Sequence, residues 1–366
     1  MAVSVLTKKM LRSIVNARGQ AIAVASVVMC GTACYITLAT AYRNLLLTRD
    51  TYYAQYRMAD FEIKVERAPR TSLFKIEALD GVRQVRGRIV EDVTVDIEGV
   101  EETRTGRMIS MPSHDENVLD DIVILEGRYF EESGEDEVIL SQRFAQMNHL
   151  GVGDSLDMTV DGKRYTLRIA GLAQSPEYVY MIRGIEEMVP SNERFGILWV
   201  TEEFAESAKN MQAACNDIVG AVDSPDELGR ILDQAEDLLD GYGVYGKVKA
   251  ADQLSNNFLS SEIKGLSVQS KVVPGIFLGV AALVIMILLN RMVRNERTQI
   301  GLMKAYGYSN WAVGFHYVQF ALLLSTAGCL VAFVVGHILA HQMIQLYVEF
   351  YQFPVLRAAM YPDVMV

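Results

Sequence analysis

The sequence predicts a membrane α-helical protein with three transmembrane helices and a large extracytoplasmic α+β insert. Three apolar runs, 21–42, 272–290 and 311–335, contain no Asp, Glu, Lys or Arg. At about 1.5 Å per helical residue, each run roughly spans a hydrocarbon core of about 30 Å. Between the first two runs, residues 43–270 carry 24 Lys and Arg against 42 Asp and Glu, a net charge of −18. The whole chain carries −11, so its ends are basic, an asymmetry typical of a membrane protein with a soluble insert.

Basic residues set the predicted orientation. Residues 1–20 form a predicted cytoplasmic juxtamembrane helix, in which Leu6, Met10 and Ile14 share one face. Lys and Arg in short loops stay on the cytoplasmic side, so 1–20 and 291–310 lie inside and 43–270 lies outside. The alternative is a cleaved signal peptide, but the first apolar run is longer than a signal h-region of about 7–15 residues.

The insert is predicted to begin and end with stalk helices, at 43–58 and 250–270. Alternation of apolar and polar residues predicts its strands, and capping residues mark its helices. The predicted strands are Phe61–Glu66, Val82–Glu98, Thr103–Met111, Gly196–Val200 and Asp217–Val222. The predicted helices are Ser72–Leu79, 202–210 behind a Thr201 cap, and Pro225–Leu239 behind a Ser224 cap.

A β-rich subdomain at about 113–190 interrupts this pattern. Its clearest feature is a hairpin of Asp157–Val160 and Tyr165–Ile169, joined by the turn-forming pair Asp161-Gly162. The short apolar segment Glu137–Leu140 precedes a helix predicted at Ser141–Leu150. The chain order therefore predicts one α+β domain with a subdomain inserted into it.

Several kinds of chemistry find no support in the residues. The acidic balance argues against nucleic-acid binding, which needs a basic surface. The GxxxxGK[ST] spacing of a phosphate-binding loop is absent, so ATP hydrolysis by that motif is excluded. Ser141 and Ser175 have no recognisable His and Asp partners. Only Cys215 of the four cysteines lies within 43–270, so that block holds no internal disulfide.

Patterns that suit a metal ion are weak, and we predict none. His337 and His341 are four residues apart, but no acidic or Cys ligand lies near, and packing at a membrane interface explains them. The acidic loop around His114 lacks the spacing of a calcium loop. The charge run Glu131–Glu137 fits a solvated turn.

The segment 291–310 is longer than a simple connection between two spans needs to be. Ile300, Leu302 and Met303 form the predicted apolar side of a short basic helix that Gly307 ends. Its basic residues suit lipid headgroups, and its apolar side suits docking to a cytoplasmic partner; both interpretations fit the residues.

Small residues recur in the predicted spans. Gly275 and Gly279 have the spacing that lets membrane helices approach closely, and ordinary use of glycine in such helices is the alternative. Gly328 and Gly336 are a second pair of small residues.

The segment Arg294–Val313 resembles the signature of FtsX-like ABC permeases, the group that includes MacB. The Ile-Gly-x-x-Lys-Ala-x-Gly core of that signature corresponds to Ile300–Gly307. Asp136–Asp154 resembles the family's EVxLS…A…LGxxxGD stretch. The order of spans and insert is also similar, so the resemblance covers essentially the whole chain.

The resemblance implies a periplasmic-core-like domain in a non-catalytic permease subunit of a bacterial inner (cytoplasmic) membrane. A separate cytoplasmic ABC ATPase would bind ATP and Mg, leaving no cofactor in this chain. Its motion would pass through the helices to the extracytoplasmic domain, for export or extraction of a lipoprotein, lipid or peptide. Other implied partners are a second permease unit or homodimer, and membrane lipids. The implied ATPase-docking residues are Arg294, Glu296, Gln299, Ile300, Gly301, Leu302, Met303, Lys304, Ala305 and Gly307.

Two other functions stay open. The same machine could regulate an extracytoplasmic cell-wall hydrolase, or the chain could be a membrane-anchored sensor without an ATPase. The family has a fourth span, whereas 336–366 reads as an extracytoplasmic tail, so we interpret the chain as the N-terminal part of a longer permease.

Overall fold

The computed structural model describes residues 18–354 except 98, 101, 113–116, 132–135, 185 and 187–188. Most of the predicted helix at 1–20, the loop at His114 and the end of the predicted tail therefore lie outside the described residues. The chain forms two compact units. Within the described residues, the first unit contains 18–46 and 262–347, and the second contains 47–261 and 348–354.

Three long helices are apolar enough to cross a membrane by length and composition. They are α2 (Arg18–Gln55), α7 (Leu254–Asn295) and α9 (Asn310–Phe350). Each helix extends beyond its apolar run. The third continues past the predicted span of 311–335 to Phe350, and no proline occurs within it.

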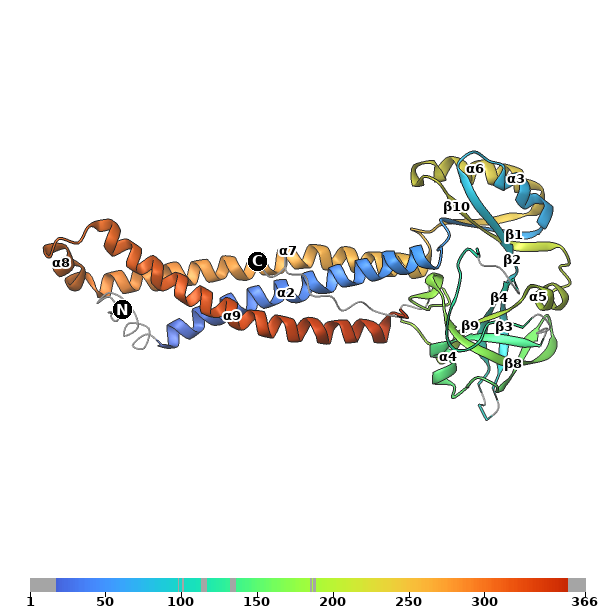
Figure 1. Ribbon diagram of the computed structural model, residues 1–366, viewed down its shortest axis with the longest axis horizontal. Helices are drawn as coiled ribbons and strands as arrows, with labels where there is room; N and C mark the ends of the chain where they lie inside the picture. The colour runs from blue at the N-terminus through green and yellow to red at the C-terminus, as the bar shows by residue number, and fades with distance from the viewer. Residues whose placement is uncertain are drawn as a thin grey trace. The chain divides into compact units, whose positions relative to one another are not determined.

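The helices lie alongside one another in the first unit (Figure 1). Val24, Leu288, Phe320 and Leu324 form an apolar cluster between them. Small residues bring α2 and α9 close together, since a Cβ at Gly328 would lie 2.7 Å from the carbonyl oxygen of Ala25. The Oγ1 of Thr37 donates a hydrogen bond to the carbonyl of Gly336 at 3.2 Å.

The second unit contains a small lobe built on a four-stranded sheet, in the order β11-β1-β10-β2. In β1, Phe61 and Ile63 face the helices while Glu62 and Lys64 face the other way, as alternation in a strand requires. Figure 1 shows α3 and α6 over one face of this sheet. The strands are β1 (Phe61–Pro69), β2 (Val82–Arg88), β10 (Ala214–Val222) and β11 (Val244–Lys249). The helical segments are η1 (Arg70–Ser72), α3 (Leu73–Glu77), η3 (Pro225–Glu227), α6 (Leu228–Leu239) and η4 (Asp240–Tyr242).

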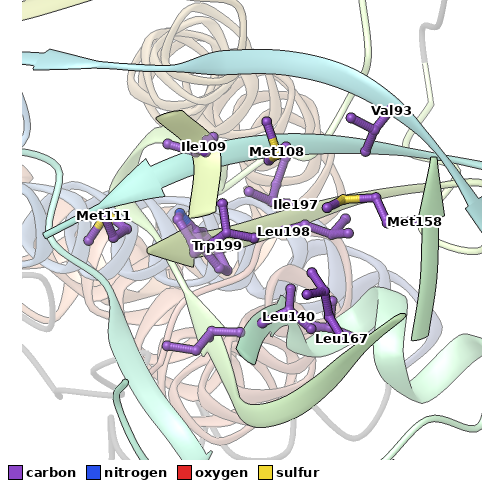
Figure 2. Close-up of a cluster of buried hydrophobic side chains, with 14 of the residues drawn as sticks. Val93, Met108, Ile109, Met111, Leu140, Met158, Leu167, Ile197, Leu198 and Trp199 are labelled. Atoms are coloured by element: carbon purple, nitrogen blue, oxygen red, sulfur yellow. The ribbon is translucent and has the colours of Figure 1, made fainter. Parts of the chain in front are cut away.

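The rest of the second unit is a barrel lobe, built on a sheet in the order β5-β8-β6-β9-β4-β3-β7. The long strand β8 also pairs with β7, which closes the sheet on itself and leaves β7 without a free edge. Figure 2 shows side chains of the apolar core, which includes Trp199, Met108 and Leu198. The strands are β3 (Val90–Asp96), β4 (Arg104–Met111), β5 (Val123–Gly127), β6 (Glu137–Ser141), β7 (Ser155–Val160), β8 (Lys163–Gln174) and β9 (Phe195–Thr201). The helical segments are α4 (Gln142–Met147), η2 (Pro176–Tyr178) and α5 (Glu202–Ala208).

Predictions of turns and helix caps, which rest on a few neighbouring residues, agree with the structure in most cases. The hairpin across Asp161-Gly162 is confirmed as the β7–β8 pair. The Oγ1 of Thr201 accepts a hydrogen bond from the amide of Phe204 at 3.2 Å, which confirms the cap of α5. Ser224 occupies the cap position before Pro225 as predicted, but its side chain makes no capping bond, and a 3-10 turn precedes α6.

Predictions that needed long-range partners were less successful. The single strand predicted over Val82–Glu98 is two strands in different lobes, because β2 pairs with β10 and β3 pairs with β4. The β-rich part is also wider than 113–190, since β3, β4 and β9 belong to the same sheet. Strand β11 was not predicted.

Candidate functional site

The connection between α7 and α9 is a short helix, α8 (Arg297–Ala305), with defined ends. The helix breaks at Glu296, whose φ of −98° and ψ of 15° depart from helical values. The Oη of Tyr317, in the second turn of α9, donates to the Glu296 carboxylate at 3.1 Å. This bond joins the corner between α7 and α8 to α9.

The far end of α8 is fixed by Gly307, which has a φ of +89°. The amide of Gly307 donates to the carbonyl of Lys304, and the amide of Tyr308 donates to that of Met303, at 3.0 and 3.1 Å. These two bonds satisfy the last carbonyls of a helix and need a left-handed residue such as glycine. The Oγ of Ser309 then caps α9 by accepting from the amide of Ala312.

The predicted docking residues lie on or beside α8, and none of the α8 residues is buried. Ile300 and Met303 are half-buried, whereas Leu302 is 58% exposed, so the three do not share one face as predicted. The physical reason is the helical turn of about 100° per residue, which sets Leu302 on the far side from Ile300. Leu302 instead lies one turn from Tyr306, which is 77% exposed, and Trp311 nearby is 86% exposed. The other exposed positions are Arg294, Gln299, Gly301, Lys304, Ala305 and Gly307.

The other predicted packing residues, Gly275 and Gly279, contact no neighbouring helix. No atom of the described chain lies within 4 Å of a Cβ built on either glycine. The close helix contacts fall at Gly31, Gly328 and Gly336 instead. The packing role of Gly275 and Gly279 stays a prediction.

A buried cluster of charges in the second unit was missed by the sequence analysis. Arg88, at the end of β2, is 2% exposed. Its Nε donates to Asp217 at 2.6 Å, and its two terminal nitrogens donate to the two oxygens of Glu177 at 2.7 Å each. The Oδ2 of Asp120 lies 3.6 Å from the same guanidinium. The signal in the sequence was Asp217, a charged residue within the largely apolar strand β10.

Burial and charge shift the pKa values of this cluster in opposite directions. Burial alone would lower the pKa of Arg88, but the charges of Asp217 and Glu177 outweigh it and raise that pKa well above its ordinary value. Burial, with the charge of Glu177, raises the pKa of Asp120 to about 7. Burial, with the charge of Asp217, raises the pKa of Glu62 to about 8. At neutral pH Glu62 therefore keeps most of its proton and Asp120 is partly protonated, whereas, despite burial, the charge of Arg88 lowers the pKa of Asp217.

In the part of the chain that the structure describes, no group of three His, Cys, Asp or Glu residues is arranged so that it could hold a metal ion. The Nε2 of His341 lies 3.2 Å from the side-chain nitrogen of Gln345. The carboxylates around Arg88 are held by guanidinium groups.

Comparison with known proteins identifies two matching families. Residues 13–238 match the MacB-like periplasmic core domain, and residues 271–360 match the FtsX-like permease C-terminal domain. Among solved structures, one similar domain is the extracellular domain of the noncanonic ABC-type transporter YknZ from Gram-positive bacteria, at 16% sequence identity. The match covers 49% of this chain and 90% of that chain, with a TM-score of 0.34. The periplasmic region of MacB from Actinobacillus actinomycetemcomitans is similar at 7% identity, covering 56% of this chain and 92% of that chain, with a TM-score of 0.35. A search of curated proteins found no match.

Proposed function

The chain belongs to the FtsX-like permeases that carry a MacB-like periplasmic core domain, and we propose that it transmits the motion of a separate ABC ATPase to its extracytoplasmic domain. In this proposal, ATP and Mg bind to the ATPase and this chain has no catalytic role. The proposed cargo is a lipoprotein, lipid or peptide.

The observation that carries the proposal is the exposed surface of α8. Leu302 and Tyr306 present apolar surface at one side of a helix whose two ends are fixed, and Lys304 places a positive charge on another side of the same helix. Leu and aromatic side chains surrounded by charge are typical of a protein-binding surface, because their burial supplies most of the binding energy. We assign this surface to a groove on the ATPase.

The contacts of α8 support transmission along the helices. Glu296 connects the α7–α8 corner to Tyr317 of α9, so a force on α8 acts on both long helices together. The helices α2 and α7 each contribute residues to both units. We propose that this continuity carries the motion.

A second permease unit, or a second copy of this chain, is the proposed partner of the unoccupied face at Gly275 and Gly279. Neither glycine meets another part of the described chain. Small residues on a membrane helix allow close approach of a partner helix. Membrane lipids would contact the remaining apolar faces.

Co-purification of the full chain with ABC ATPases encoded beside its gene tests the docking assignment. Lys304→Glu reverses the charge on α8, and Gly301→Trp adds bulk to its exposed surface; each should abolish recovery of the ATPase. Phe74→Asp is the matched control, because Phe74 is an exposed aromatic residue of the second unit. Unchanged recovery with both α8 variants would refute the docking assignment.

A further inference from the structure

One segment of the second unit contacts both the helix ends and the buried charge cluster. We call this segment, Ser175–Ile182, the strap. On its helix side, the side-chain nitrogen of Gln253 donates to the Glu177 carbonyl at 2.7 Å, and the amide of Tyr180 donates to Ser255 of α7 at 2.9 Å. The amide of Gln352, just after α9, donates to the carbonyl of Val179 at 2.8 Å.

Aromatic rings reinforce the same attachment. Tyr180 of the strap stacks on Phe258 of α7, with ring centroids 5.0 Å apart. Tyr351, which follows α9, lies 5.5 Å from Tyr180, and Phe353 lies 5.9 Å from Tyr52 of α2. Aromatic pairs in these arrangements add stabilisation beyond the area they bury. The strap is therefore bound to α7 and to the segment after α9 by hydrogen bonds and by rings.

The opposite side of the strap binds the small lobe. Glu177 uses its main-chain carbonyl for Gln253 and both side-chain oxygens for Arg88. The 3-10 turn η2 holds this residue in place, since Pro176 fixes the backbone and the Oγ of Ser175 accepts from the Glu177 amide. One residue thus connects the beginning of α7 to strand β2.

Hydrogen bonds made by polar side chains cross the junction between the two lobes. The Arg86 side chain donates to the carbonyls of Leu119 and Ser110, at 2.8 and 2.6 Å. The amide side chain of Asn216 exchanges two hydrogen bonds with the backbone of Val90, at 2.8 and 2.9 Å. Polar interfaces within a chain permit relative motion more readily than a continuous apolar core does. The junction is therefore the part of the second unit best suited to move.

We propose that the strap transmits displacement of α7 and of the segment after α9 to the junction between the lobes, with Glu177 and Arg88 as the connecting pair. This inference rests on the proposed function, in which the helices move. Tyr178 of the strap lines a cleft of about 270 Å³ between the lobes, together with Glu62 and Arg107. Displacement of the strap therefore also changes the shape of this cleft.

Hydrogen exchange measured by mass spectrometry on the full chain in lipid nanodiscs tests the strap. The reporters are the amide of Val90, which bonds across the lobe junction to Asn216, and the neighbouring amide of Ile89, which bonds to Ser110 of the barrel lobe. Neither amide bonds to the strap. Removing the helix-side bonds with Gln253→Ala and Ser255→Ala together should speed exchange in peptides covering 86–95 by about tenfold, since two hydrogen bonds are lost.

Three further variants complete the experiment. Glu177→Gln should give the same increase at 86–95, because it weakens the bond to Arg88. Gln212→Ala, which removes a glutamine-to-carbonyl bond outside the strap, should give none. If the double variant also speeds exchange in the core strand β9, Ser255→Ala alone, which removes a single bond, replaces it and is interpreted in the same way.

An increase confined to 175–182 and 348–354 would overturn the inference, because the helix ends would then not influence the junction. No ATPase is present in this assay. Failure of ATPase co-purification would therefore refute the proposed docking function without changing the outcome here.

Discussion

Replacing Arg88 by methionine tests how strongly the buried cluster stabilises the second unit. Methionine keeps most of the volume but removes the charge and the three Arg88 hydrogen bonds to Asp217 and Glu177. Both carboxylates then stay buried without their cation. Breaking a buried ion pair on one side costs about 3–5 kcal/mol, against a total stability of about 5–15 kcal/mol for a typical domain.

The expected shift in melting temperature follows from the size of the unit. The second unit contains about 220 residues. For a domain of this size, 1 kcal/mol corresponds to roughly 2–4 °C, so Arg88→Met should lower the melting temperature by roughly 6–20 °C. The orphaned carboxylates bind protons more readily in the folded state than in the unfolded state, so the loss should be smaller at pH 5 than at pH 8.

Fluorescence of Trp199 provides the assay. The chain has two tryptophans, and Trp199 lies in the barrel core, so a Trp311→Phe background makes Trp199 the sole reporter of the second unit. Arg128→Met is the matched control, because Arg128 also pairs with a glutamate, Glu137, through two nitrogens but is 41% exposed. Exposed ion pairs contribute little to stability. Equal shifts for the two variants would refute the argument.

Three further predictions concern pH, the end of α8 and the helix bundle. Burial raises the pKa of Glu62 and of Asp120, so the folded chain holds more protons than the unfolded chain between about pH 5 and about pH 8. The melting temperature reported by fluorescence should therefore fall as pH rises through that window, and a rise would contradict the assignment. Gly307→Val forces a β-branched residue into a left-handed conformation at a cost of about 1–2 kcal/mol. Trypsin should therefore cleave the end of α8 faster, and an unchanged cleavage rate would contradict the role of Gly307 in ending the helix. Gly336→Leu should lower the thermal stability of the protein in detergent, because a Cβ at this position would lie 3.0 Å from Ile36 of α2. The control Gly279→Leu should leave the thermal stability unchanged. Equal losses of stability for the two variants would show that the α2–α9 contact does not depend on the small residue.

Local features of the sequence were sufficient for many elements. Apolar runs without charge predicted the three long helices, because helix length and composition alone decide whether a segment suits a membrane. The Asp161-Gly162 turn and the Thr201 cap were found for the same reason, since each depends on residues within a few positions. Gly307 likewise marked the end of α8.

Features that depend on distant partners were not predicted from the sequence. The alternation of apolar residues continues from β2 into β3, so it does not reveal that the two strands pair in different lobes across Ile89. Strand β11 alternates only weakly and is recognised by its pairing with β1. Lobe boundaries were therefore misplaced even where the strands themselves were found.

The sequence by itself determined which segments are long and apolar enough to cross a membrane, and where the short helix between two of them ends. These properties depend on neighbouring residues along the chain. Only the tertiary structure decided that Leu302 is exposed while Ile300 is half-buried, and that Arg88 meets Glu177 and Asp217 in one buried cluster. The physical reason is that burial and ion pairing depend on distances in space. The chain brings Arg88, Glu177 and Asp217 together only when both lobes fold.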